Sequence, residues 1–550
     1  MARVQVAGFL FVLVFPAQFL LAGFAFPQGV ASGDVWSDRA ICWTRTSSAG
    51  SIRIDISHDA GFAQISATTV ITASADTGLA IKYEATSLNP ALRYFFRFTR
   101  IDTGEVSPTG TFVTAPAPET EHSFRFVYTG DANAARQPFR VLNFAADESP
   151  DLWFLAGDTI YGDQAAGDLG IATDLTGYRD KYAQNRSDPA LQRLSATASA
   201  WVQWDDHEVT NDYDGGEPES DIAPQQIADA YQAFFENQPI RDQGVSGDLR
   251  RIYRSFRYGS LVEFFVLDCR QYRSRDAGRD GGDIDPYGFI LPTRDPAVIA
   301  RLQDPSRTML GAAQLAWLKQ GLAASTARWK FILSSVTFTS LLVMPYDRWD
   351  GYDAERFDLL HFIDENRIDG AVLLSADIHG NTYNPDVTYY LRNSLGQSFT
   401  PDFRVPEFVT GPIGQATIRQ EISEFAAGTL NLPPFLLNCP LLFNLLVDFA
   451  QNQVYERNHL AFLEPNRYAY LVVDVTSQGL TLTHKGIPAD SSDATSPIAT
   501  LSTVTLPEPS LCGALPANLL MSMMLLCGPG LSFVLGRRRR RPPRQRTPER

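Results

Sequence analysis

Four short apolar runs in the sequence each end in residues that could bind a metal ion. The runs span 124–129, 152–156, 201–204 and 370–375, and near-continuous apolar runs of this length are typical of strands buried on both faces. They lead into Gly130-Asp131, Gly157-Asp158, Asp205-Asp206-His207 and Asp377-Ile378-His379. A glycine and an aspartate after one strand form a common turn, but turns alone do not explain four such ends.

These strand ends predict a cluster of carboxylates around bound cations. Ligands collect beyond the carboxyl ends of strands in open α/β sheets, so we expect the four ends to share one crevice. Carboxylates held close together repel one another unless cations lie between them. An oxygen-rich donor set favours hard cations. The candidate ligands are Asp131, Asp158, Asp206, His207, Asp377 and His379.

The order of the motifs resembles that of the PhoD-type alkaline phosphatases, relatives of the purple acid phosphatases. GDTIY at 157–161 together with WDDHE at 204–208 is the most specific part of the resemblance. It extends over roughly 26–484 and includes LDCRQYR at 267–273, WDGY at 349–352, ADIH at 376–379 and, upstream, FPQGVASGD at 26–34 and ICWTR at 41–45. Two features depart from the family: 129–133 lacks the cysteine of some members, and Ala376 replaces the usual glycine.

The resemblance implies an αββα metallophosphatase sandwich, an α/β fold, with a binuclear or larger metal centre. Asp158 would bridge two metals, with Asp131 and Tyr161 on one and Asp206 on the other. Asp377 and His379 would complete the ligand set, and His459 is a weaker further candidate. Ferric iron with calcium or another divalent ion is the expected content. The catalytic residues would be Asp206 and His207, the histidine protonating the leaving group or stabilising the phosphoryl group.

Such a centre predicts a metal-dependent phosphoester hydrolase in which a metal-activated water attacks phosphate monoesters or diesters. A phospholipase D-like phosphodiesterase is an alternative, since both activities use the same metal core. The other alternative is a non-catalytic surface binding protein with a structural metal site. His207 argues against that alternative, because a structural site has no need of a histidine beside its ligands.

Three further residues are candidates for substrate binding. Arg270 and Arg273 could hold phosphate through two hydrogen bonds each, although ion pairs with nearby carboxylates would explain them equally well. Tyr352 could line the pocket, and a tight turn at 350–352 is the alternative.

The two ends of the chain have the pattern of export and sorting signals. Residues 1–25 combine Arg3, a long apolar run and Gly23-Phe24-Ala25, as in a secretory signal peptide; an uncleaved anchor is the alternative. Residues 510–550 contain an apolar stretch at 511–536 followed by five arginines. This resembles the PEP-CTERM signals cleaved by exosortase-type proteases in Gram-negative bacteria, and a permanent membrane anchor is the alternative. We therefore expect export to the periplasm, the outer surface or the extracellular space.

The chain has 550 residues, which is enough for two or three domains. The net charge of −15 disfavours nucleic-acid binding and attracts divalent cations. Alternating strands predict a small all-β sandwich over 26–118, before a proline-rich linker. Strands and helices alternate over 121–485, with helices expected at 312–322 and 355–365.

Two segments and the cysteines complete the sequence predictions. Residues 416–453 are either an insertion over the site or an interaction surface, and 486–509 has the Ser, Thr and Pro content of a flexible stalk. Cys42, Cys269 and Cys439 form no disulfide framework, so we expect buried free thiols rather than a single disulfide such as Cys42–Cys439.

Overall fold

The structure is a computed structural model. It describes residues 25–215, 222–241, 250–275, 296–339, 347–388, 404–428, 460–489 and 496–509, together with Leu441 and Leu445. The described residues up to Pro509 belong to one compact unit. Residues 1–24 of the predicted signal segment 1–25, and all of the predicted segment 510–550, lie outside the described residues. Within the described ranges, no helix has the length and apolar content needed to cross a membrane.

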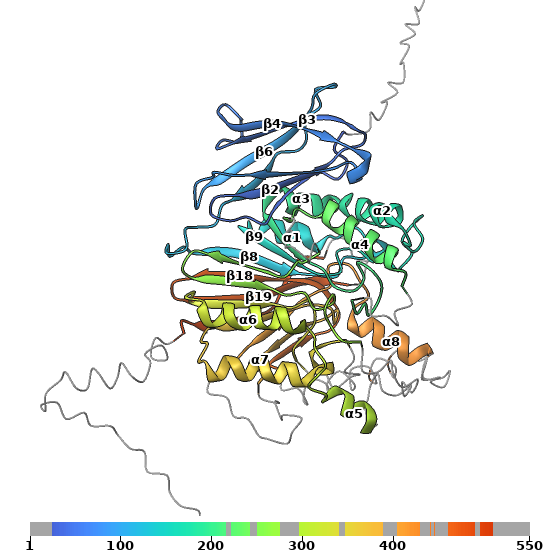
Figure 1. The fold of residues 1–550 in the computed structure, drawn as a ribbon, viewed down its shortest axis with the longest axis vertical. Helices are drawn as coiled ribbons and strands as arrows, with labels where there is room; N and C mark the ends of the chain where they lie inside the picture. Colours follow the sequence, from blue (N-terminus) through green and yellow to red (C-terminus); the bar gives the residue numbers. More distant parts are fainter. Residues whose placement is uncertain are drawn as a thin grey trace, which may run out of the picture. The chain divides into compact units, whose positions relative to one another are not determined.

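Two large mixed sheets form the centre of this unit (Figure 1). The first has nine strands in the described residues, in the order β20 (Ala499–Pro507), β19 (Gly479–Pro488), β18 (Arg467–Thr476), β8 (Phe124–Thr129), β9 (Leu152–Ala156), β10 (Ser199–Gln203), β1 (Val30–Gly33), β2 (Ala40–Arg45) and β5 (Ala80–Ala85). The second has seven strands there, in the order β11 (Arg254–Tyr258), β12 (Val262–Val266), β13 (Trp329–Leu333), β14 (Ala371–Ser375), β16 (Glu407–Val409), β15 (Asn381–Asn384) and β17 (Phe462–Glu464).

The two sheets share one apolar core, and helices cover their outer faces. β9 is an example of a strand that is covered on both faces. Leu152 and Phe154 point into the core between the sheets, whereas Trp153 and Leu155 pack under the helices. Successive side chains of a strand point to opposite faces, so a strand covered on both sides needs the unbroken apolar run seen in the sequence. The helices over the first sheet are α1 (Val141–Asp147), α2 (Leu175–Arg186), α3 (Pro189–Thr197) and α4 (Pro224–Asn237).

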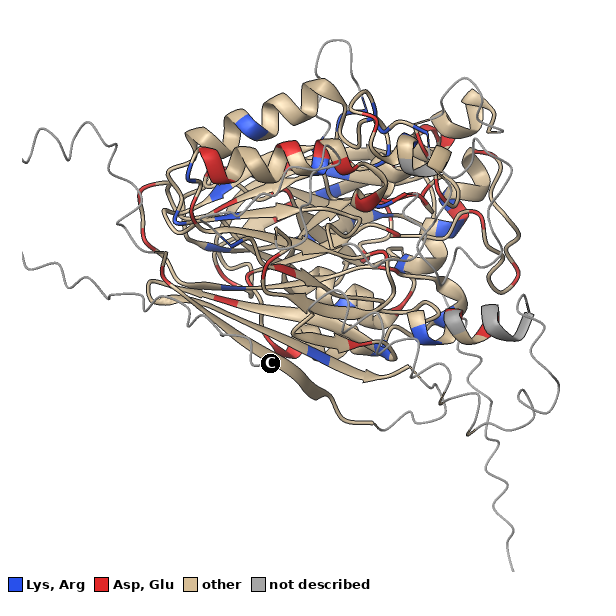
Figure 2. Cartoon of the chain, turned by 90° about the horizontal axis from the view of Figure 1, so that it is seen from below, with Lys and Arg blue, Asp and Glu red and all other residues tan. Residues whose placement is uncertain are grey.

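The second sheet is covered by α6 (Gly311–Ala324) and α7 (Asp353–Glu365), which match the two helices expected at 312–322 and 355–365. Leu318 and Leu322 of α6 are buried, as the apolar stripe of that helix predicts. Two further helices, α5 (Pro296–Leu302) and α8 (Ile418–Gly428), lie in the connections. Figure 2 shows charged residues on helices, loops and strands alike.

The N-terminal part forms a sandwich, but only one of its sheets is separate. β4 (Ile65–Ala73), β3 (Gly50–Ser57), β6 (Arg93–Arg100) and β7 (Gly110–Val113) make a four-stranded sheet that packs on β1, β2 and β5. β1 in turn pairs in parallel with β10, at Gly33 and Ala200. A Cβ atom at Gly33 would lie 2.6 Å from the Ala200 carbonyl oxygen, so this close pairing requires glycine.

The prediction of a flexible stalk over 486–509 is wrong for its second half. β20 pairs antiparallel with β19 along its length, with Leu506 opposite Leu480 and Val504 opposite Leu482. Leu506 and Val504 pack against the core between the sheets, while the intervening threonines face outward. The segment alternates apolar and Thr residues, which is the pattern of a half-buried strand. Its Ser and Thr content misled the composition-based interpretation.

Cys42 and Cys269 are buried free thiols, as expected. Cys439 lies outside the described residues, as does most of 416–453. The described part of that segment contains α8, which proves to belong to the functional site.

Candidate metal centre

The loops after β8, β9, β10 and β14 bring the predicted ligands together at one edge of the two sheets. Asp131, Asp158, Asp206 and His379 are buried, and Asp377 is half-buried. Four of these five residues have left-handed backbone, with φ of 64° at Asp131, 50° at Asp158, 71° at Asp377 and 50° at His379. Such conformations are costly outside glycine and concentrate at functional sites. The strands β8, β9 and β14 thus each end in a sharp turn that directs polar side chains into a common space.

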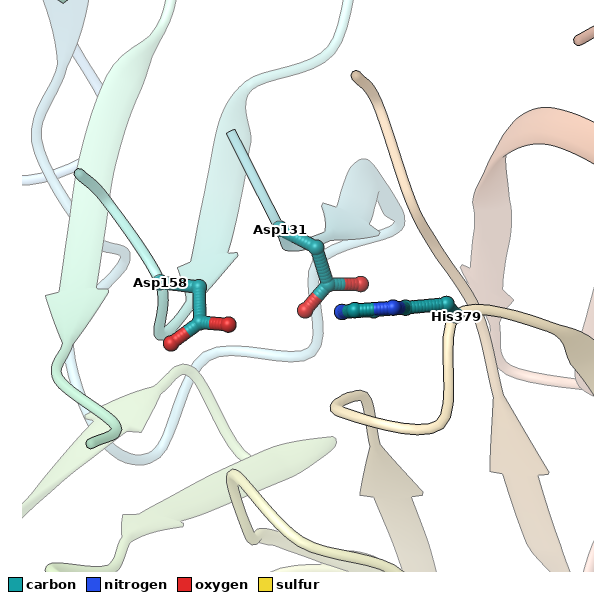
Figure 3. Close-up of side chains that lie close together, drawn as sticks. All are labelled: Asp131, Asp158 and His379. Atoms are coloured by element: carbon teal, nitrogen blue, oxygen red, sulfur yellow. The ribbon is translucent and has the colours of Figure 1, made fainter. Parts of the chain in front are cut away.

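Four overlapping groups of side chains could each hold a metal ion, because their ligand atoms lie within 4.8 Å of one another. Asp158 and Asp206 each belong to more than one group, which is the arrangement expected of ligands shared between ions. Figure 3 shows the first group, with the carboxylates and the imidazole pointing toward one another. The groups are Asp131, Asp158 and His379; Asp158, Asp206 and His207; Asp205, Asp206 and Asp377; and Asp206, Asp212 and Asp347.

The chemistry of the carboxylates is suited to bound cations. One oxygen each of Asp131, Asp158 and Asp206 is buried without a hydrogen-bond partner, and an unpaired buried acceptor is unfavourable. Burial also raises the pKa of Asp131 to about 7. Burial and the neighbouring Asp206 carboxylate raise the pKa of Asp158 well above its ordinary value. A cation would satisfy the free oxygens and remove this repulsion.

Three aspartates in these groups were not predicted from the sequence. Asp205 directly precedes the predicted ligand Asp206, so the paired acids of WDDHE were the available signal. Asp212 lies six residues after Asp206 in the same loop, and its backbone N–H donates to the Asp206 carboxylate. Asp347 lies in the connection between β13 and α7, and no motif marks it.

Arg270 lies inside the acidic cluster and makes the ion pairs that were the alternative to substrate binding. Its side chain is fully buried and donates to both oxygens of Asp205, at 2.5 and 2.8 Å. It also donates to Asp347 at 3.0 Å and to Asp377 at 3.2 Å. One arginine therefore joins carboxylates from three loops and offsets part of their charge, in a two-bond geometry that lysine could not reproduce.

Arg273 and Tyr352 bond to each other and to the backbone around the site. The guanidinium donates to the Tyr352 hydroxyl at 3.0 Å and to the carbonyl of Tyr213 at 3.0 Å. It also donates to the Asp212 carbonyl, and Tyr352 donates to the Ser274 carbonyl at 2.6 Å. Both side chains are buried. The contacts that Arg273 and Tyr352 make within the described residues therefore hold the loop that carries Asp212 in place.

The family model of the PhoD-like phosphatases matches residues 126–483, and that of their N-terminal domain matches residues 17–116. The chain belongs to the PhoD-like phosphatase family. It is 31% identical over 396 residues to alkaline phosphatase D of Bacillus subtilis strain 168, and the match covers 66% of this chain and 65% of that protein.

Solved structures agree with membership of the PhoD-like family. The structure of PhoD superposes with a TM-score of 0.72 at 25% identity, covering 89% of this chain and 91% of PhoD. A purple acid phosphatase, PPD1 from seeds of yellow lupin (Lupinus luteus), superposes with a TM-score of 0.51 at 13% identity, covering 87% of this chain and 73% of PPD1. The second likeness is one of fold.

In this PhoD-like chain, His207 is held by a carboxylate that the sequence analysis missed. Its Nδ1 lies 2.7 Å from an oxygen of Asp163, whose other oxygen accepts from the backbone N–H of Asn211 at 2.8 Å. Tyr161 packs on the imidazole, with ring centroids 4.2 Å apart. Burial lowers the pKa of His207, but the Asp206 and Asp163 carboxylates raise it more, to about 9. Asp163 is the second aspartate of the GDTIYGD segment, which was the available signal.

His379 is oriented in the same way by Glu421 of α8. Its Nδ1 lies 2.6 Å from the Glu421 carboxylate, and its Nε2 lies 3.1 Å from the Tyr161 hydroxyl. The Ile418 backbone N–H donates to the His379 carbonyl at 2.9 Å, which fixes α8 to the loop. A carboxylate behind a ligand histidine sets its tautomer and increases its basicity. The described first part of the unassigned segment 416–453 therefore orients a histidine of the candidate metal site.

Glu208, the last residue of WDDHE, ties two ligand loops together. It accepts from the backbone N–H of Thr159 at 2.6 Å, from the Thr159 hydroxyl at 2.7 Å and from the backbone N–H of Asp205 at 2.9 Å. Gly411 makes room for another ligand, because a Cβ atom there would lie 2.2 Å from an Asp131 carboxylate oxygen. His459, the weaker ligand candidate, lies outside the described residues.

Proposed function

We propose that this protein is an exported, metal-dependent phosphoester hydrolase acting on phosphate monoesters or diesters. The observation that carries the proposal is the set of buried oxygens of Asp131, Asp158 and Asp206 that accept no hydrogen bond, beside two histidines that carboxylates orient. Membership of the PhoD-like phosphatase family supports the same reaction class. We also infer that the layers correspond to the αββα sandwich of metallophosphatases.

The residues that would hold the ions are those of the four groups other than His207, joined by Tyr161, which bonds His379. We propose ferric iron with calcium or another divalent ion, since phenolate suits a trivalent ion and carboxylates suit hard divalent ones. When bound, the ions would supply the positive charge that acidifies the attacking water and offsets charge on the phosphoryl oxygens.

The chain's own residues hold the cluster in place and would donate a proton to the leaving group. Nδ1 of His207 is hydrogen-bonded to Asp163, so Nε2 is the ring nitrogen that can reach a substrate. The carboxylates around His207 keep its proton in place at neutral pH, and a general acid needs that proton to release an alkoxide leaving group. Arg270 holds Asp205 and Asp377 in place, so the cluster is preorganised rather than assembled by the substrate.

Export and sorting remain part of the proposal. We propose that residues 1–25 direct secretion and that an exosortase-type protease processes 510–550, with transient or permanent membrane attachment through 511–536.

The proposed function is tested by measuring hydrolysis of p-nitrophenyl phosphate and bis-p-nitrophenyl phosphate before and after metal removal. We expect activity on at least one ester, its loss with a chelator, and its return when metal is added back. Elemental analysis confirms that the chelated protein is free of metal, and circular dichroism confirms that it is folded. A metal-loaded, folded protein that hydrolyses neither ester would instead support the structural metal site.

A second prediction concerns Tyr161 and iron. A tyrosine phenolate bound to ferric iron gives a visible charge-transfer band, so the concentrated native protein should be coloured and Tyr161→Phe should remove the band. Burial raises the pKa of Tyr161 well above its ordinary value, so only a strongly charged ion would make it a phenolate.

The matched control is Tyr182→Phe, because Tyr182 is buried nearby and bonds Thr159 but belongs to none of the metal groups. This variant should keep the colour. A protein that is colourless while metal-loaded and active would show that the centre uses other ions.

A further inference from the structure

A small cavity lies beneath the loops that carry Asp131 and Asp158, on the side covered by α2 and α3. Its volume is about 10 Å³, which is room for a single water-sized species. It is too small for phosphate or another tetrahedral oxyanion. β9, β10, α2 and α3 all contribute to its walls, and its polar lining includes Thr159, Tyr182, Asn185, Arg186 and Gln238.

Two buried donors on the wall of this cavity have no hydrogen-bond partner. They are Nε of Arg186, the last residue of α2, and the indole Nε1 of Trp153, on β9. Both side chains are more than nine-tenths buried. An unpaired buried donor is unfavourable, and two such donors on residues that line one small cavity indicate a shared acceptor.

The charge of Arg186 has no carboxylate to offset it among the described residues. Two other buried arginines differ in this respect: Arg254 pairs with Asp34 at 2.9 Å, and Arg270 pairs with Asp205 at 2.5 Å. Arg186 instead donates to the neutral Gln238 side chain at 2.5 Å and lies over the Trp43 ring at 4.3 Å. Burial lowers the pKa of Arg186 to about 10, so the guanidinium stays charged at neutral pH.

We propose that this cavity is a binding site for one small monovalent anion, chloride under ordinary conditions, held between the guanidinium of Arg186 and the indole N–H of Trp153. An anion accepts both hydrogen bonds and neutralises the guanidinium. A water molecule could accept the same bonds, but it would leave the buried charge uncompensated and would bring two hydrogens that need acceptors of their own.

The site is coupled to the metal loops through the residue before Arg186. The Asn185 side chain donates to the carbonyl of Ala132 at 2.6 Å and to the carbonyl of Thr159 at 2.8 Å. These carbonyls follow the ligands Asp131 and Asp158 by one residue. An anion that fixes the end of α2 therefore also fixes the loops that carry two metal ligands.

The direct test is crystallographic. Crystals of the full chain soaked in sodium bromide should show an anomalous peak in the cavity, within hydrogen-bond distance of Arg186 and Trp153. Density for a water molecule only, with no bromide signal, would overturn the proposal.

The test in solution compares thermal unfolding in sodium chloride and in sodium gluconate at equal ionic strength, because gluconate is too large for the cavity. The melting temperature should be higher by about 2 °C in about 200 mM chloride, with saturation at high concentration. Arg186→Met should abolish the difference. Trp153→Phe, which removes one donor and keeps the ring, should raise the chloride concentration for half-saturation about tenfold.

Arg193→Met is the matched control, since Arg193 lies on α3 with an exposed side chain paired to Asp147. It should retain the response of the unaltered protein. If Arg186→Met responds to chloride as Arg193→Met does, the effect is a surface one and the proposal is wrong. If Arg186→Met does not fold, the bromide peak and Trp153→Phe still decide the question.

Discussion

Replacing Asp158 by asparagine is expected to lower phosphoester hydrolysis by at least about 10³-fold, since the ions it would help to hold supply several kcal/mol of transition-state stabilisation. Asp158 belongs to two of the four metal groups, so its loss affects both. The amide keeps the size of the side chain but removes the negative charge and one acceptor oxygen. Metal content measured on the purified variant should fall together with turnover.

Asp168→Asn is the control for this change, because Asp168 is exposed in the same connection after β9. It should keep metal and activity. The buried charge of Asp158 also predicts an effect on the thermal stability of the apoprotein. Without metal, Asp158→Asn should be at least as resistant to heat as the unaltered apoprotein, since burial and carboxylate repulsion disfavour the charged form of Asp158. Full metal content and full turnover in Asp158→Asn would show that Asp158 is not a ligand of the centre.

Replacing His207 by alanine should lower turnover of an alkyl phosphate by at least about 100-fold while the metal content stays unchanged. An alkoxide is a poor leaving group, so the reaction needs the proton that His207 would donate. Asp163→Asn should give a smaller loss in the same direction, because the imidazole remains but is no longer oriented by a carboxylate. Both losses are measured as kcat against the unaltered protein.

The choice of substrate makes this prediction decisive. A p-nitrophenolate leaving group needs no proton, so His207→Ala should retain much more of its activity on the aryl ester than on the alkyl ester. An equal loss on both esters, together with a loss of metal, would make His207 a ligand, a role that its place beside Asp158 and Asp206 also permits. Full activity on the alkyl ester would exclude His207 from protonation.

The sequence predicts the ligand-bearing strands because their patterns are local. The runs before Asp131, Asp158, Asp206 and Asp377 are buried on both faces, and such strands must be apolar throughout. β20 shows the limit of this reasoning: its alternation of Thr with Leu and Val was present in the sequence, but its composition favoured a linker. The pairing of β1 with β10 has no local signal at all, because Gly33 alone does not specify its partner.

The residues of the site also fall into two groups, those with a local signal in the sequence and those without one. The residues at strand ends could be predicted from the apolar runs before them, and the structure brings the predicted His207 and Tyr161 together with them. The positioning residues could not, because their role depends on distant contacts: Asp163 with His207, and Glu421 with His379. Arg270 was found, but only its burial among Asp205, Asp347 and Asp377 shows that its donors serve these carboxylates.

The pairing of distant strands constrains when the protein can fold. β1 and β10 meet at Ser32 and Ser199, which are 167 residues apart, and β8 and β18 are joined by Arg125 and Asp474, which are 349 residues apart. β8, which carries the first ligand loop, lies between β9 and β18, so one of its edges stays unpaired until residues 467–476 arrive. Contacts this distant in sequence form slowly, and unpaired strands aggregate. A chain emerging from a ribosome or a membrane channel therefore has no complete core until nearly all of the compact unit is available, and its metal loops can be closed only at the end.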